Sequence, residues 1–303
     1  MTTPASPPTP DATPAQPHPR LSRRQCLALG LSALWLPADA RAELADLRER
    51  GTLKIAVYKN HWPFSDSGKE GVQGLDAKLG QALAQQLKLN VQWLPFDAGE
   101  NMHDDLRNMV WKGHYLGYGP ADVMLQVPID RYLIEETRQV EFLGPYYRHE
   151  IGWLVTDALS SADLQRMALD GVSLTAETGT AAASALLGHG GGRFRNAVHL
   201  EANGVDAARS VVQGQRQAAY VTRAQAEAAM ASAAAQPTSP TQRLRFEAMA
   251  LPGTPAKGWV VGMAIRKGQP ELSQALGTAL KALQDNGTLT AIYAAQGLQR
   301  VAP

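Results

Sequence analysis

The stretch Leu53-Lys54-Ile55-Ala56-Val57 sets the first element of the fold, because a short apolar run after a turn signal predicts a β-strand. Residues 75–87 then carry a leucine at every fourth position, which is the spacing of one apolar face of a helix. Val91-Gln92-Trp93-Leu94 predicts the next strand. A strand, a helix and a second strand in this order indicate an α/β fold with a mainly parallel sheet.

The same alternation continues along the chain, with a change from period-2 to helical patterns at each step. Further strands are expected at residues 122–125, 151–155, 172–175, 218–221 and 260–265. Helices are expected at residues 105–112, 206–212 and 224–235, in a leucine-striped segment that starts at Pro270, and in a last short segment around Leu289 and Tyr293.

Residues 1–42 predict a proline-rich leader and an export signal, not a part of the fold. Seven of the 19 prolines lie in residues 1–20. The pair Arg23-Arg24 precedes an apolar run from Cys26 to Leu36, which is followed by two overlapping A-x-A patterns, Ala38-Asp39-Ala40 and Ala40-Arg41-Ala42. The paired arginines indicate a twin-arginine route, with a general secretory signal as the alternative. The run is too short to span a bilayer, so the mature chain is expected in the periplasm.

Composition limits the function classes. The chain has 303 residues, 45% of them hydrophobic, and 29 basic residues against 28 acidic ones give a formal net charge of +1. This balance argues against a nucleic-acid partner. Cys26 is the one cysteine, so zinc sites built on several cysteines are excluded, and it precedes the apolar run, so no lipid anchor is expected.

No arrangement of residues typical of an enzyme is found. The sequence lacks G-x-S-x-G, H-E-x-x-H and a phosphate-binding loop with Lys-Ser/Thr. The neighbouring carboxylates Asp104-Asp105 and Glu135-Glu136 would not face one another on a helix, so a solvated surface role is the simpler interpretation. We therefore expect no catalytic residue, no metal and no cofactor.

Several segments taken together resemble the family 3 periplasmic solute-binding proteins, from about residue 50 to residue 298. The resembling segments are Leu53 to Val57, Val72-Gln73-Gly74-Leu75-Asp76, Val140 to Tyr147, Val172 to Thr180, and the tail from Gly262 to Gly268 with Asp285-Asn286-Gly287-Thr288. The resemblance implies a two-lobed type II fold with a discontinuous first lobe, built from residues 43–150 and 248–303, and a second lobe of residues 151–247. It further implies a monomer that captures a small molecule between the lobes for the membrane permease of an ABC importer.

The sequence departs from that family where amino-acid ligands are held. Glu136 stands where the family carries the arginine for the α-carboxylate, and Thr222 stands where it carries the aspartate for the α-amino group. Common α-amino acids are therefore expected to bind weakly, because a zwitterion would lose hydration without strong partners. Arg131 or Arg138 would rescue the carboxylate if the loop after Pro128 turned either one inward.

A narrower resemblance gives an alternative function. Asn60 to Ser65 and Asp122 to Pro128 are similar to motifs of the binding-protein-like accessories of quinoprotein (PQQ) alcohol dehydrogenases. This implies a periplasmic dehydrogenase as partner in place of an importer. The segment from Arg107 to Tyr118 is longer than the family's usual connection and would shape a pocket or a docking surface.

The predicted cleft favours a flat or weakly charged ligand, polar or aromatic. The residues expected to bind it are Trp62, Phe64, Gln126, Asp130, Arg131, Tyr146, Gly179, Thr180 and Thr222.

Overall fold

The computed structural model describes residues 38–234 and 243–303, with side chains from Leu44 onward. The predicted leader, the arginine pair and the apolar run lie outside the described residues. The two A-x-A patterns fall at the start of helix α2 (Ala38–Arg50). Leu44 and Leu47 of this helix are buried in the first hydrophobic core.

Five strands form the first sheet in the order β4-β1-β5-β12-β6. Their bounds are β1 (Thr52–Tyr58), β4 (Asn90–Phe96), β5 (Val123–Pro128), β6 (Val140–His149) and β12 (Trp259–Arg266). β1 is parallel to both β4 and β5, whereas β12 is antiparallel to β5 and β6. The sheet therefore joins strands from the beginning and the end of the chain. A two-stranded hairpin of β2 (Asp66–Gly68) and β3 (Gly71–Gln73) lies apart from it.

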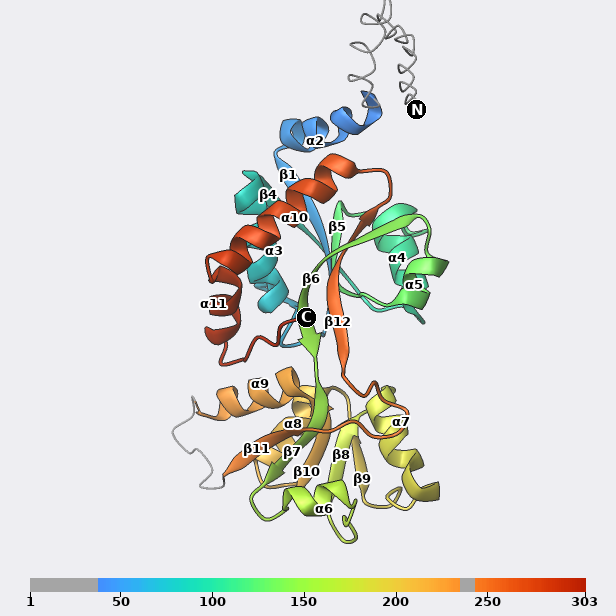
Figure 1. The fold of residues 1–303 in the computed structure, drawn as a ribbon, viewed down its shortest axis with the longest axis vertical. Coiled ribbons are helices and arrows are strands. Elements are labelled where there is room, and N and C mark those ends of the chain that lie inside the picture. The colour runs from blue at the N-terminus through green and yellow to red at the C-terminus, as the bar shows by residue number, and fades with distance from the viewer. Residues whose placement is uncertain (1–37, 235–242) are drawn as a thin grey trace, which may run out of the picture. The chain divides into compact units, whose positions relative to one another are not determined.

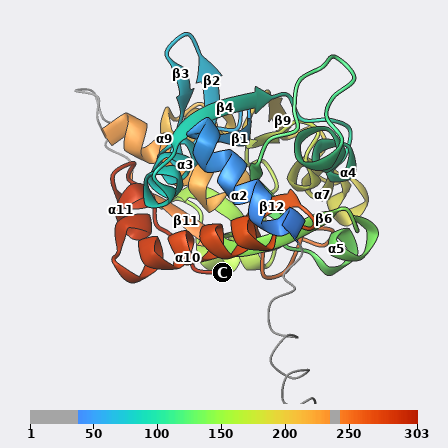
Figure 2. The ribbon, with the colours of Figure 1, turned by 90° about the horizontal axis from the view of Figure 1, so that it is seen from above.

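Helices cover both faces of this sheet, as Figures 1 and 2 show. Ile55 and Val57 of β1 point to the face covered by α3, α10 and α11, and Ala56 points to the face covered by α4, η1 and α5. Both faces are apolar because side chains alternate along a strand and both are buried. The helix bounds are α3 (Leu75–Leu87), α4 (Met102–Leu106), the π-helix η1 (Arg107–Trp111), α5 (Arg131–Glu136), α10 (Pro270–Asp285) and α11 (Thr288–Ala294).

The second sheet repeats this plan with strands in the order β11-β7-β10-β8-β9. Trp153 of β7 packs with α6 and α7 on one face, and Leu154 packs with α8 and α9 on the other. The strand bounds are β7 (Ile151–Thr156), β8 (Leu174–Glu177), β9 (Val198–Glu201), β10 (Ala218–Thr222) and β11 (Leu244–Ala248). The helix bounds are α6 (Ser161–Gln165), α7 (Ala181–Gly188), the 3-10 turn η2 (His189–Gly191), α8 (Gly204–Val212) and α9 (Arg223–Ala234).

The chain passes between the two sheets twice. β6 ends at His149 and β7 begins at Ile151, so a single residue, Glu150, separates strands of different sheets. The return runs from the end of β11 to the start of β12. Leu251 in this return packs with the second core, although residues from 248 onward were predicted to belong to the first lobe.

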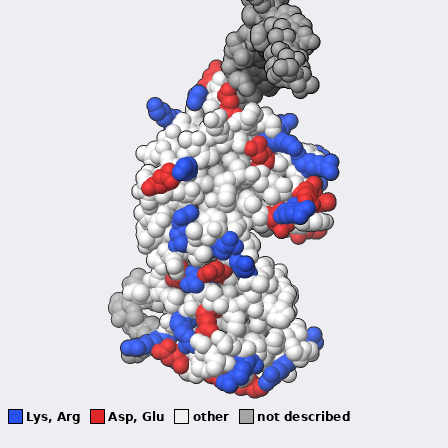
Figure 3. Space-filling view, in the orientation of Figure 1, with Lys and Arg blue, Asp and Glu red and all other residues white. Residues whose placement is uncertain are grey.

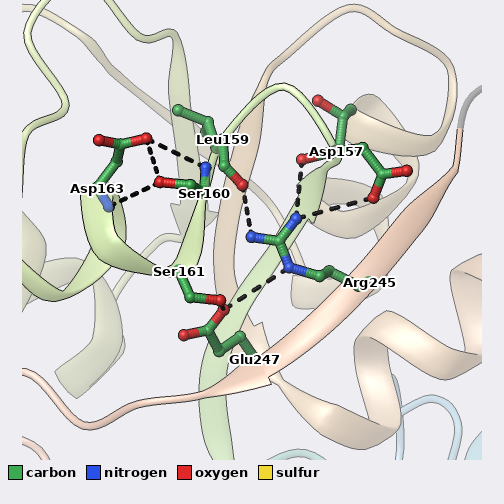
Figure 4. Close-up of polar contacts among 8 residues, drawn as sticks. Asp157, Leu159, Ser160, Ser161, Asp163, Arg245 and Glu247 are labelled. Carbon is green, nitrogen blue, oxygen red and sulfur yellow. Dashed lines mark hydrogen bonds and ion pairs between the residues drawn. The ribbon is translucent and has the colours of Figure 1, made fainter.

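An arginine fastens the edge strand β11 to its neighbour β7 and to the turn that follows β7. Figure 4 shows the Arg245 guanidinium between Asp157, Glu247 and the backbone oxygen of Leu159. It also donates to the backbone oxygen of Thr156 at 3.3 Å. One side chain thus donates to two backbone oxygens, that of Thr156 at the end of β7 and that of Leu159 in the turn that follows.

The surface is mixed in charge. On the face drawn in Figure 3, basic and acidic side chains are interspersed over the described residues. Within residues 38–234 and 243–303, no helix is long and apolar enough to cross a membrane.

Candidate ligand-binding cavity

Residues from both sheets line a cavity of about 300 Å³. From the first sheet and its loops come His61, Trp62, Phe64, His149 and Trp259. From the second sheet, its helices and the return segment come Ile151, Glu177, Thr180, Ala181, Ala182, Tyr220, Val221, Thr222, Gln225, Thr254 and Pro255. A cavity of this size is at the lower end of small-molecule sites.

The loop after β1 carries Trp62 and Phe64, and the start of α3 fixes its path. The backbone N–H groups of Leu75 and Asp76 donate to the oxygens of Pro63 (3.0 Å) and Phe64 (2.8 Å). Gly74 precedes them with φ of 104°, and a Cβ there would lie 2.4 Å from the Phe64 oxygen. Only glycine fits this approach. Phe64 is thereby buried, whereas Trp62 stays 39% exposed.

Stacked rings form the wall on the side of the first sheet. The His61 ring lies on Phe64 with centroids 5.3 Å apart and an interplanar angle of 23°. Phe64 contacts His149 at 4.8 Å, and His149 stacks on Trp259 at 4.7 Å and 11°. Such pairs are stable because ring faces and edges carry opposite partial charges. The wall is therefore rigid, broad and weakly polar.

Polar groups form the wall on the side of the second sheet. Glu177 ends β8, and its Oε2 accepts from the Gln225 side-chain nitrogen at 2.9 Å. The other atom of that amide, Oε1, accepts from the Thr222 backbone N–H at 3.0 Å. Thr180 caps α7, because its hydroxyl accepts from the Ala183 N–H at 3.1 Å. This wall offers ordered hydroxyl, amide and carboxylate groups.

The lining holds one carboxylate and no side chain that is cationic at neutral pH. Burial raises the pKa of Glu177 above its usual value. Burial also lowers the pKa of His61 to about 4 and that of His149 to about 3, so both imidazoles are neutral at pH 7. Lysine and arginine are absent from the lining residues that the structure describes.

A series of buried polar side chains that do not line the cavity is hydrogen-bonded to His149. Its Nε2 lies 3.1 Å from Gln126 Oε1, and the Gln126 amide nitrogen donates to Asp76 Oδ1 at 3.3 Å. The Tyr146 hydroxyl accepts from the Gln126 backbone N–H at 2.9 Å and donates to Asp76 at 3.4 Å. Burial raises the pKa of Asp76 to about 7. Gln126 and Tyr146, both predicted to bind ligand, thus lie behind the cavity wall and not in it.

The structure brings together some of the predicted site residues and not others. Four of them line the cavity: Trp62, Phe64, Thr180 and Thr222. Gly179, with φ of 73°, makes the turn between Glu177 and Thr180 without lining the cavity.

Two predicted residues, Asp130 and Arg131, lie at the start of α5 and do not line the cavity. Asp130 caps the helix, with its Oδ1 accepting from the Leu133 N–H at 3.0 Å. The Arg131 side chain is 91% exposed and pairs with Glu135 at 2.7 Å. Arg138 is exposed as well. The described lining therefore holds no arginine to replace the missing carboxylate anchor.

Sequence reasoning missed His149, Trp259, Glu177, Gln225 and Tyr220. Their positions depend on where β6 ends, where β12 begins and how α9 starts, which no local pattern states. Glu177 alone carried a signal, since it stands three residues before Thr180 in the same predicted turn.

The described residues contain no group of three or more His, Cys, Asp or Glu side chains placed to hold a metal ion. No protein-family profile matches the sequence, and no curated protein matches it.

Solved structures do resemble the chain. An ancestral cationic amino acid solute-binding protein, AncCDT-1, has 22% identity and a TM-score of 0.61, with 84% of this chain and 99% of that chain covered. An amino acid ABC transporter substrate-binding protein from Streptococcus pneumoniae, bound to L-arginine, has 21% identity and a TM-score of 0.54, with coverage of 85% and 99%. The Bordetella pertussis BvgS VFT2 domain has 23% identity and a TM-score of 0.54, with coverage of 86% and 97%.

These likenesses define the fold. It is the two-lobed α/β fold of type II periplasmic binding proteins, and its first sheet is built from both ends of the chain. The predicted fold class is confirmed.

Proposed function

We propose that the chain is a periplasmic solute-binding protein that captures a small polar or aromatic molecule in the described cavity. The observation that carries this proposal is the lining itself, because ring faces from one sheet oppose hydrogen-bonding groups from the other around about 300 Å³. A ligand in contact with both walls would join two lobes between which the described chain passes twice, as hinge closure requires. Delivery to the permease of an ABC importer is the role that follows, with no catalysis.

The same lining disfavours common α-amino acids. Arginine, the side chain that best matches a carboxylate, is absent from the described lining, and Arg131 is exposed on α5. Burying a zwitterion against neutral imidazoles and indoles would leave its carboxylate without a charged partner. The ligand should therefore be recognised through its flat or weakly polar parts.

The test is a thermal-shift screen of the mature protein against amino acids, carboxylates, amines and quinone-like compounds. A ligand at 100 times its Kd should stabilise the protein by about 2.7 kcal/mol. Trp62→Ala should abolish the shift, and Tyr132→Ala, a 68% exposed residue on α5, should keep it. Equal loss in both variants, or no ligand from any class, would count against the cavity as a binding site.

Export to the periplasm belongs to the same proposal. Arg23-Arg24, the apolar run and the A-x-A patterns support a twin-arginine signal cleaved near Ala42. Replacing both arginines by lysine should leave precursor in the cytoplasm. Normal periplasmic mature protein from that variant would refute the route and leave export intact.

A second candidate function has its own support, in the loop of residues 112–120. Tyr115 is 87% and Leu116 68% exposed, and neither lines the cavity. His114 stacks on Tyr118 at 4.2 Å, so the loop is held in shape. An exposed aromatic loop suits docking on a periplasmic quinoprotein alcohol dehydrogenase. Co-purification with such an enzyme, lost in Tyr115→Ser/Leu116→Ser and kept in Trp62→Ala, would favour this accessory role over transport.

A further inference from the structure

We propose that the cavity selects an organic cation, namely an amine joined to a flat apolar group. This inference rests on the proposed function, since it assumes that the cavity takes a small molecule, and it goes on to name the chemical class.

The charge of the lining comes from Glu177. Gln225 holds one of its carboxylate oxygens at 2.9 Å, and the Gly204 backbone N–H also donates to the carboxylate. Gln225 is fixed in turn by the Thr222 N–H at 3.0 Å. The Gln225 amide and the Gly204 N–H are both neutral, so they orient the Glu177 carboxylate without cancelling its negative charge. A ligand ammonium group would supply the missing positive charge.

No cation–π contact among the described residues involves a ring of the cavity. The described cation–π contacts place Arg193 over Phe194 and Arg223 over Phe246, and neither phenylalanine lines the cavity. Trp62 and Trp259, which do line it, have the ring type that attracts cations most strongly. An amine with a flat substituent would therefore find a charge partner and stacking surfaces in one cavity.

The described lining residues offer an anionic ligand no positively charged partner. The histidines of the lining are held neutral by burial, with a pKa of about 4 for His61 and about 3 for His149. Arg223, next to the lining residue Thr222, is engaged by Glu150 at 2.5 Å and Glu227 at 3.6 Å. A carboxylate placed beside Glu177 would meet like charge in a partly desolvated site, which is unfavourable.

The experiment compares ligands of one shape and different charge. Binding of 2-phenylethylamine, 3-phenylpropanoate and 2-phenylethanol to the mature protein is measured by calorimetry, together with tryptamine, 3-indolepropanoate and tryptophol. In at least one set the amine should bind at least about tenfold more tightly than its alcohol, and the carboxylate should bind most weakly. Phenyltrimethylammonium carries a positive charge but no N–H donor. Its binding therefore reports the attraction between a cation and the cavity without hydrogen bonding to Glu177.

Two variants assign the preference to Glu177. Glu177→Gln keeps the side-chain shape and an acceptor for Gln225, and should reduce amine binding at least about tenfold while leaving alcohol binding unchanged. Glu201→Gln is the matched control, because Glu201 is paired with Glu177 in register on β9 and does not line the cavity. It should change amine binding less than about threefold. Unchanged thermal unfolding of both apo variants verifies that they fold.

Three outcomes would overturn the inference: equal or tighter binding of the carboxylates, no binding of any amine in the panel, or equal loss in both glutamate variants. If another class of ligand binds and Trp62→Ala abolishes that binding, the proposed function stands and the inference about charge falls. If Trp62→Ala leaves the binding of every ligand intact, the proposed function falls as well.

Discussion

The Nε2 atom of His149, in the wall of the cavity, lies 3.1 Å from the Oε1 atom of Gln126, which is buried in β5. Because an amide oxygen only accepts, the imidazole carries its proton on Nε2 in this arrangement. The other ring nitrogen, Nδ1, is buried and has no hydrogen-bond partner. The orientation of a cavity ring is thus set by a residue that does not touch the cavity.

Gln126 extends this link to Asp76 at the start of α3, where the carboxyl also lies 3.4 Å from the Tyr146 hydroxyl. The second carboxyl oxygen of Asp76, Oδ2, is buried and has no hydrogen-bond partner. Buried polar groups are costly when they lose their partners. The hydrogen-bonded series of side chains from Asp76 through Gln126 to His149 is therefore sensitive to the loss of Gln126.

Gln126→Leu should destabilise the protein by about 2–4 kcal/mol, because it leaves both the His149 N–H and the Asp76 carboxyl without this partner. Urea unfolding followed by far-UV circular dichroism measures the change. Gln139→Leu, at an exposed turn, is the control and should fall within about 0.5 kcal/mol of wild type. A similar small effect for Gln126→Leu would show that this hydrogen-bonded series contributes little.

Much of the fold could be predicted from the sequence, because the main strands and several helices are apolar in their own period. The strand at 53–57 and the leucine stripe at 75–87 appear as β1 and α3. The segment predicted as one helix at 105–112 divides into α4 and the π-helix η1. Periodicity reports which face is buried, and it does not distinguish neighbouring types of helix at that length.

The site was less predictable. Trp62 and Phe64 were found because the segment Asn60 to Ser65 resembles a motif of a known group of proteins. His149 and Trp259 lie 110 residues apart in sequence and meet only because β6 pairs with β12. Arg131 was named because it flanks the position counted for the carboxylate anchor, yet α5 directs its side chain to solvent. Motif counting gives a position along the chain, and burial depends on the elements around it.

Ligand binding should change tryptophan fluorescence through Trp62 and Trp259. Both indoles line the cavity, so a bound molecule replaces water at their rings. The strongest binder from the thermal-shift screen is titrated while emission is recorded. Trp62→Phe and Trp259→Phe should each reduce the signal, whereas Trp111→Phe, on η1 and outside the cavity lining, should retain it. A signal that only Trp111→Phe reduces would place the ligand elsewhere.

Arg245→Met should loosen the edge of the second sheet. The variant keeps an apolar stem but removes the donors to the backbone oxygens of Thr156 and Leu159. We expect a loss of about 1–2 kcal/mol in the free energy of unfolding, reduced by the partial exposure of the guanidinium. Lys281→Met is the control, since Lys281 forms an exposed pair with Asp285 within one helix and should contribute about 0.5 kcal/mol or less. Equal losses would argue against a special role for Arg245.

Gly258→Ala should damage the return into β12. Gly258 has φ of 65°, and a Cβ there would lie 1.7 Å from the His149 backbone oxygen. Gly268→Ala is the matched control, because φ is 94° and nothing lies within 4 Å of the added carbon. The control should lose about 1–2 kcal/mol through backbone strain alone. Gly258→Ala should lose about 1–3 kcal/mol more and weaken ligand binding, since His149 and Trp259 flank it. Equal stabilities would contradict the close approach.

The last prediction concerns the pH dependence that Asp76 confers. Burial raises the pKa of this carboxyl from 3.8 to about 7, so the folded protein holds a proton that the unfolded chain releases between these values. The stability of wild type relative to Asp76→Asn should therefore fall as pH rises from about 4 to about 7, by up to about 1.4 kcal/mol per pH unit. His61 and His149, whose pKa values are lowered, act in the opposite direction below about pH 6.5. Their contribution is common to both proteins and cancels in the difference. Urea unfolding of both proteins at half-unit pH steps gives this difference, and a value that stays constant from pH 4 to pH 7 would show that Asp76 ionises in the folded protein as it does in the unfolded chain.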